Sequence, residues 1–146
     1  MKGILDQLNN EQVTKAGWFK ESGATDDGFP YVDLANIFEN GGGKYDNIPA
    51  YAPVKKTTSK IDKKIESILN KRLIVFLQQG NLNVINQELG SLIGSELKKM
   101  ISSIKSPANR QATIERKGYN DPMIHTGEFM RAVGYKINDG VLQGKG

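Results

Sequence analysis

The chain has 146 residues, a net charge of +4 and no cysteine, which favours one domain and excludes disulfide frameworks and thiolate metal sites. Its apolar content of 38% and charged content of 25% are those of a globular protein and exclude wholesale disorder. The sequence lacks both the apolar run of a signal peptide and the roughly 20 apolar residues of a membrane-spanning helix, so we expect a soluble protein with no membrane partner.

The first quarter of the chain predicts two short helices and a strand. Residues 1–12 favour a helix with its apolar side chains on one side, and residues 15–22 favour a strand that carries the only tryptophan. Residues 23–28 have the composition of a turn. Over residues 31–40, apolar residues at helical spacing predict a short amphipathic helix, which the glycines at 41–43 end.

Residues 41–58 show no periodicity and contain Pro49 and Pro53, so we expect a long loop. Loops of roughly fifteen residues are uncommon in compact domains without a purpose. The segment is either a docking arm or a merely flexible surface loop, and the residues favour neither.

Two long helices follow and form the predicted core. The first opens at Ser59, with Asp62 as a weak capping-box partner, and its apolar face comprises Ile61, Ile65, Ile68, Leu69, Leu73 and Phe76. The second runs from Leu82 or Asn83 to Ile104. Gly90 and Gly94 lie four residues apart near its apolar face, where another element can approach closely. The pair predicts an antiparallel helical hairpin that makes up the bulk of the core.

After Pro107, residues 108–117 favour one or two helical turns, and residues 129–138 alternate like a strand. Residues 138–140 are a turn signal that allows a short returning strand, and residues 144–146 are expected to be a loose tail. The predicted fold class is therefore α+β: a single domain over residues 1–146, with a small antiparallel β-sheet packed against a long α-helical hairpin.

Signals for catalysis are poor. His125 is the only histidine, which excludes a multi-histidine zinc site, and no carboxylates are paired as acid and base. The glycines before Lys44 lack the spacing of a phosphate loop, and Thr126-Gly127 lacks the preceding aspartate of an aspartic protease. We therefore expect no enzyme, no cofactor and no metal.

Basic residues are concentrated in one segment. Residues 55–72 contain two acidic residues, Asp62 and Glu66. They contain seven basic residues: Lys55, Lys56, Lys60, Lys63, Lys64, Lys71 and Arg72. This face can neutralise phosphates, dock an acidic protein surface, or simply be solvated. Interleaved aromatic residues for base stacking are missing, which favours the solvated face.

Residues near the C-terminus resemble a known family. Thr113-Ile-Glu-Arg-Lys-Gly118, then Pro122-Met-Ile-His-Thr-Gly127, then Phe129 and Val133-Gly-Tyr135, are similar to the C-terminal signature of tailed-phage neck and tail-completion proteins, of the phage HK97 tail-component and Mu-like virion morphogenesis types. Upstream, Ala35 to Gly41 and then Ile48-Pro-Ala50 resemble a second signature of that family, although the arginine that usually follows Ile-Pro is missing.

The resemblance implies a structural virion protein at the head–tail junction, made in the host cytoplasm. It implies a homo-oligomeric ring, sixfold in preference to twelvefold, that surrounds the DNA channel and joins the head-side connector to the tail terminator or tail tube. The candidate interface residues are Arg116, Lys117, Gly118, Pro122, Ile124, Thr126, Gly127 and Arg131. The candidate docking or channel-facing residues, close to packaged DNA, are Lys55, Lys56, Lys60, Lys63 and Lys64. The alternative function is a small basic nucleic-acid-binding protein.

Overall fold

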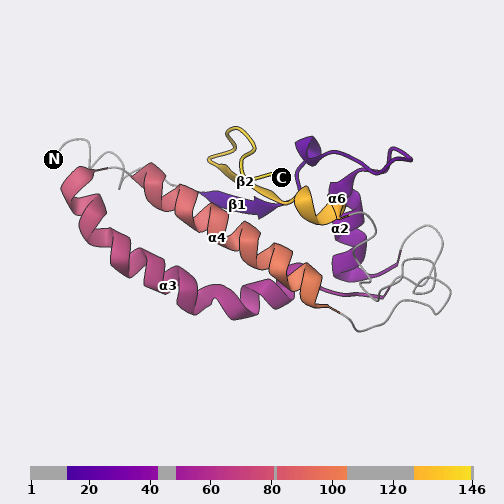
Figure 1. Ribbon diagram of the computed structural model, residues 1–146, viewed down its shortest axis with the longest axis horizontal. Helices are drawn as coiled ribbons and strands as arrows, with labels where there is room; N and C mark the ends of the chain where they lie inside the picture. The colour runs from indigo at the N-terminus through magenta and orange to yellow at the C-terminus, as the bar shows by residue number, and fades with distance from the viewer. Residues whose placement is uncertain (1–12, 43–48, 81, 105–126, 146) are drawn as a thin grey trace.

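A computed structural model describes residues 13–42, 49–80, 82–104 and 127–145. Figure 1 shows two long antiparallel helices, α3 (Pro53–Gln79) and α4 (Leu82–Ser103), with a small sheet lying against α4. A shorter helix, α2 (Tyr31–Asn40), stands at the end of the hairpin where α3 begins. The predicted α+β fold class, with an antiparallel sheet packed against a helical hairpin, is confirmed.

The sheet joins the two ends of the described chain. Strand β1 (Thr14–Gly17) pairs antiparallel with β2 (Gly134–Ile137), in a register that places Thr14 opposite Ile137. The predicted turn after β2 is present: Asn138 and Asp139 both have positive φ, as a two-residue hairpin turn requires. The returning segment pairs with β2 through a single bridge between Tyr135 and Gln143.

Both predicted strands were too long. The first ends at Gly17, whose φ is 140°, and a 3-10 turn, η1 (Lys20–Ser22), follows it. The second begins at Gly134 and not at Phe129, because a short helix, α6 (Glu128–Arg131), precedes it. Phe129, in the first turn of this helix, is buried in the core.

Helix α2 has the predicted bounds, and Gly41 ends it with a φ of 79°. Helix α3, in contrast, begins six residues before the predicted Ser59, so the predicted 41–58 loop is wrong over its last six residues. The physical reason lies in α2. Both carboxylate oxygens of Glu39 accept backbone N–H groups at the start of α3, from Val54 at 2.8 Å and from Lys55 at 3.0 Å.

The predicted capping role of Ser59 is also wrong. Its hydroxyl donates to the Lys55 carbonyl 2.9 Å away, which is a bond inside a helix that is already formed. Pro53 occupies the first helical turn, where its missing N–H costs nothing.

The core lies at one end of the molecule, around the C-terminal half of α4. Its buried cluster comprises Trp18, Tyr31, Tyr51, Leu97, Met100, Ile101, Ile104, Phe129, Ala132 and Val133. Phe129 is central: its ring stacks on Trp18 at 4.5 Å and meets Phe38 edge-on at 5.2 Å. The indole N–H of Trp18 donates to the Phe129 carbonyl at 2.8 Å.

The helical hairpin contributes less to the core than expected. Ile61 and Phe76 of α3 are buried, but Leu69 and Leu73 are 45% and 53% exposed. Leu69 and Leu73, two of the six residues assigned to the apolar face of α3, therefore lie largely outside the core, although Phe76 in the same half of the helix is buried.

Residues 144–146 were expected to be a loose tail. Gly144 and Lys145 are exposed, yet the Gly144 carbonyl accepts a hydrogen bond from the Lys98 ammonium group at 3.3 Å. The described part of this tail is therefore held on α4.

Candidate assembly surfaces

Two of the candidate interface residues lie in the described chain, Gly127 and Arg131. The other candidate interface residues lie outside the described residues: Arg116, Lys117, Gly118, Pro122, Ile124 and Thr126. His125, the only histidine of the chain, also lies outside them.

Gly127 and Arg131 are brought together at the two ends of α6. Gly127 has a φ of 81°, and a Cβ atom there would approach an Arg131 guanidinium nitrogen to 2.8 Å. Positive φ favours glycine at this position, whereas the guanidinium lies at the end of a flexible side chain and could move aside. The signature glycine therefore has a local structural role at the start of α6.

Arg131 lines a pocket of about 380 Å³ together with residues from η1, α2 and the C-terminal segment: Ser22, Gly23, Ala24, Tyr31, Glu128, Ala132 and Lys145. The Tyr31 hydroxyl donates to Glu128 at 3.2 Å. Burial, and next the hydrogen bond to Glu128, raise the pKa of Tyr31, so its phenol stays a neutral donor at physiological pH. The pocket offers hydrogen bonds and charge of both signs.

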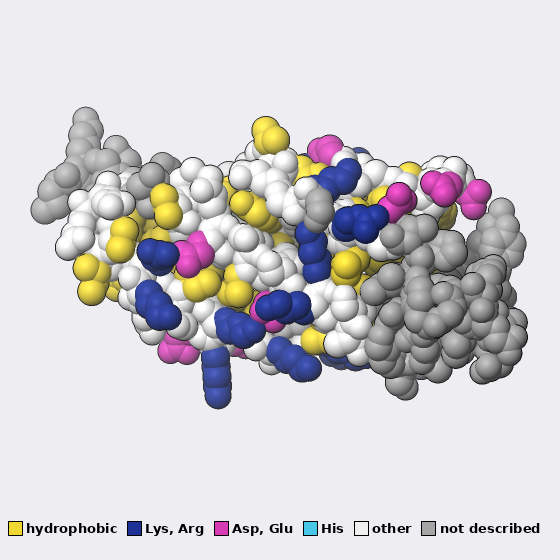
Figure 2. Space-filling view, viewed as in Figure 1, with side chains coloured by type: hydrophobic (Ala, Val, Ile, Leu, Met, Phe, Trp, Pro, Cys, Tyr) yellow, Lys and Arg dark blue, Asp and Glu magenta, His cyan; other side chains and the backbone are white. Residues whose placement is uncertain are grey.

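The five candidate docking lysines all lie on α3 and are all exposed: Lys55, Lys56, Lys60, Lys63 and Lys64. Figure 2 shows basic side chains along the viewed face of the helical hairpin. Of these five lysines, Lys64 forms an ion pair with Glu96 of α4 at 2.8 Å. The other four side chains extend into solvent.

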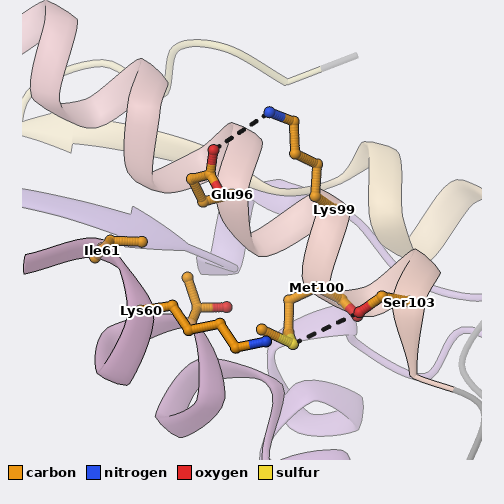
Figure 3. A pocket seen from close by; sticks show the side chains of 7 residues that line it. Lys60, Ile61, Glu96, Lys99, Met100 and Ser103 are labelled. Carbon is orange, nitrogen blue, oxygen red and sulfur yellow. Dashed lines mark hydrogen bonds and ion pairs between the residues drawn. The ribbon is translucent and has the colours of Figure 1, made fainter. Parts of the chain in front are cut away.

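A shallow groove of about 190 Å³ runs between α3 and α4 beside these lysines. It is lined by Thr57, Lys60, Ile61, Glu96, Lys99, Met100 and Ser103. Figure 3 shows Lys60 extending toward Met100, while Lys99 reaches back to Glu96 at 3.3 Å. The groove thus combines an apolar floor with cationic side chains.

Glu96 lies between two cations, and its environment favours the ionised form. Hydrogen bonding from Lys64 lowers the pKa of this carboxyl below its ordinary value of 4.5 despite partial desolvation, and Lys99 adds to the effect. A depressed folded-state pKa contributes stability above the unfolded pKa, and this contribution is lost as the pH falls through the folded value.

We therefore expect Glu96→Gln to lower the free energy of unfolding by less than about 1 kcal/mol near pH 7, as for other partly exposed ion pairs. Below pH 4.5 the difference from the wild type should shrink, because the carboxyl of the unfolded chain is then protonated, and it should vanish once the pH falls through the lower folded-state pKa. Urea unfolding at several pH values measures the difference in the free energy of unfolding between the variant and the wild type. Glu66→Gln, at an exposed position on α3, is the matched control, and an equal loss in both variants would contradict the ion-pair role of Glu96.

The end of the hairpin where α3 passes into α4 carries an uncovered apolar surface that sequence reasoning missed. Leu69, Leu73, Ile74 and Leu77 of α3 are between 45% and 64% exposed, and Val84 of α4 is 44% exposed. A signal was present in the sequence: residues 73–77 are five consecutive apolar residues, which encircle a helix and cannot all face one neighbour.

Comparison with family models, with curated proteins and with solved structures finds no match to this chain. Among the described residues, no three or more histidines, cysteines or carboxylates lie close enough to hold a metal ion. The described helices are each too short or too polar to cross a bilayer.

Proposed function

We propose that this protein is a non-enzymatic structural subunit of the head–tail junction of a tailed phage. It would form a ring of identical copies, sixfold in preference to twelvefold, between the head-side connector and the tail terminator or tail tube. The ring would surround the channel through which DNA passes.

The observation that supports an assembly role is the uncovered apolar surface at the end of the hairpin. Covering a half-exposed leucine stabilises a complex by about 1 kcal/mol, and three leucines and an isoleucine lie together here. Contiguous exposed apolar surface is typical of protein–protein contact sites. The place in the particle rests on the resemblance of the two signatures to neck and tail-completion proteins.

The lysines of α3 suit the same role. Rows of exposed cations raise the rate at which a subunit finds an acidic neighbour and help to set its orientation. Because Lys55, Lys56, Lys60 and Lys63 project from one helix, they would present this charge along a single edge of the subunit.

The proposed function predicts that the chain is a component of purified phage particles. Mass spectrometry of particles should detect it in a fixed ratio to the connector, and electron microscopy of the neck should show a ring of the expected copy number. Absence of the chain from purified particles would overturn the proposal.

One observation favours the nucleic-acid-binding alternative, namely the run of exposed lysines on α3. If it is right, duplex DNA should bind tightly and lose affinity steeply with salt, by about one power of salt concentration for each phosphate contacted. A titration of duplex DNA at several salt concentrations separates the two functions. The double variant Lys60→Gln/Lys63→Gln should then lower both the affinity and the slope, whereas a structural subunit should show weak binding in every case.

A further inference from the structure

We propose that the exposed apolar stripe of α3 binds a second copy of this chain through that copy's turn at residues 25–29. The stripe is defined as Leu69, Leu73, Ile74 and Leu77. This inference rests on the proposed function, since it names the contact that would join neighbouring subunits.

The stripe has the form of a docking site on a rigid element. Leu69, Leu73 and Leu77 are four residues apart, so their side chains follow one another along one side of α3. Ile74 widens this side and is the most exposed of the four, at 64%. A partner would therefore contact apolar side chains that are held on a long helix.

The turn at residues 25–29 presents an aromatic ring that is only partly covered in its own subunit. Phe29 is 42% exposed, although large aromatic residues usually bury most of their surface. The turn is closed by its own hydrogen bonds: Thr25 N–H donates to the Phe29 carbonyl, and Gly28 N–H to the Thr25 carbonyl, both at 2.8 Å. A turn that is already ordered loses little conformational entropy on binding.

Charge favours this pairing over contact between two stripes. Residues 24–33 contain Asp26, Asp27 and Asp33 and no basic residue, and all three are exposed. The stretch of α3 that carries the stripe, residues 69–77, contains two basic residues, Lys71 and Arg72, and no acidic one. Arg72 is paired with Glu88 of α4 at 2.7 Å, so Lys71 supplies the excess positive charge there. Two stripes would bring like charges together, whereas the turn brings opposite charges to the rim of the apolar contact.

The positions of the two surfaces suit a closed ring. The stripe lies where α3 approaches α4, at the left end of the molecule in Figure 1, and the turn projects near the opposite end. Figure 2 shows apolar side chains at the left end and a group of acidic ones at the upper right. Contact between different surfaces of identical subunits is heterologous, and with a suitable rotation it closes into a ring.

Crosslinking tests the contact directly, because the chain contains no cysteine. Purified Phe29→Cys protein is mixed with Leu73→Cys protein at increasing concentration and treated with a short bis-maleimide reagent. We expect conjugates between positions 29 and 73 to exceed, by several-fold, those formed when Val141→Cys replaces Phe29→Cys. Val141 is the matched control because it is apolar and 81% exposed but lies outside the turn.

Other occupants of the stripe give different products. Conjugates only between two copies of Leu73→Cys would mean that stripes pack on each other, and would overturn the proposal. An intramolecular product in the double variant Leu5→Cys/Leu73→Cys, without 29–73 conjugates, would assign the stripe to the N-terminal residues of the same copy. Yields equal to the Val141→Cys control would show that the turn does not bind there.

The interface and the proposed function can fail separately. Conjugates between positions 29 and 73, with the chain absent from phage particles, would leave the interface standing and remove the head–tail role. If the chain is found in phage particles but these conjugates do not form, the head–tail role would stand and the proposed interface would be removed.

Discussion

Gly90→Ala is expected to destabilise the protein, although alanine is a better helix former than glycine. A Cβ atom at position 90 would clash with two ring carbons of Tyr135, Cδ2 and Cγ. These atoms belong to the inner part of the ring, which cannot swing away without moving β2. Overpacking of this kind costs about 1–3 kcal/mol, against a gain of up to about 1 kcal/mol in helix propensity.

Gly94→Ala is the matched control for this prediction, since it lies one helical turn further along α4. Its Cβ would meet Val133 at 3.8 Å, which is an ordinary contact, so this variant should be as stable as the wild type or more stable by up to about 1 kcal/mol. Urea unfolding, monitored by circular dichroism, measures the free energy of unfolding of both variants. Equal stability of the two variants would show that Tyr135 does not pack closely on α4.

Phe129→Ala is expected to have the largest effect on stability of any single substitution named above, about 3–5 kcal/mol. Phe129 is 7% exposed and contacts the rings of Trp18, Tyr31 and Phe38. Its removal leaves a cavity between α2, α4 and β1, because these elements are held apart by their other contacts. The phenyl ring of Phe129 thus joins the N-terminal and C-terminal parts of the described chain through its packing contacts.

The only tryptophan reports on this change. Because Trp18 stacks on Phe129, its fluorescence in the folded variant should differ from that of the wild type, while circular dichroism gives the free energy of unfolding. Phe29→Ala is the control, since Phe29 is 42% exposed and its loss should change stability by no more than about 0.5 kcal/mol. A loss below about 1 kcal/mol in Phe129→Ala would contradict the central place of this ring.

The two signatures of the resemblance acquire physical roles in the described chain. Glu39 of the upstream signature holds the first N–H groups of α3, and so fixes how α2 meets the hairpin. Gly127 and Phe129 of the C-terminal signature start α6 and fill the aromatic core. Each of these residues contributes to the fold of the single chain.

Local sequence determined the elements whose ends depend only on nearby residues. Helix α2 follows from its apolar spacing and from the glycine after Asn40, and the turn after β2 follows from Asn138 and Asp139, which tolerate positive φ. The long hairpin follows from sustained helical periodicity interrupted near Gly80, which adopts the left-handed conformation. The α+β class was predictable because these signals are strong and local.

Tertiary structure decided what depends on residues far apart in the chain. The start of α3 is set by Glu39, about fifteen residues earlier, and the helical turn at Phe129 is set by a stack on Trp18, 111 positions away. Whether Leu69 and Leu73 are covered depends on how far a neighbouring element extends, which periodicity does not encode. Apolar spacing predicts that a helix has an apolar face, but only the packed fold shows which part of that face stays uncovered.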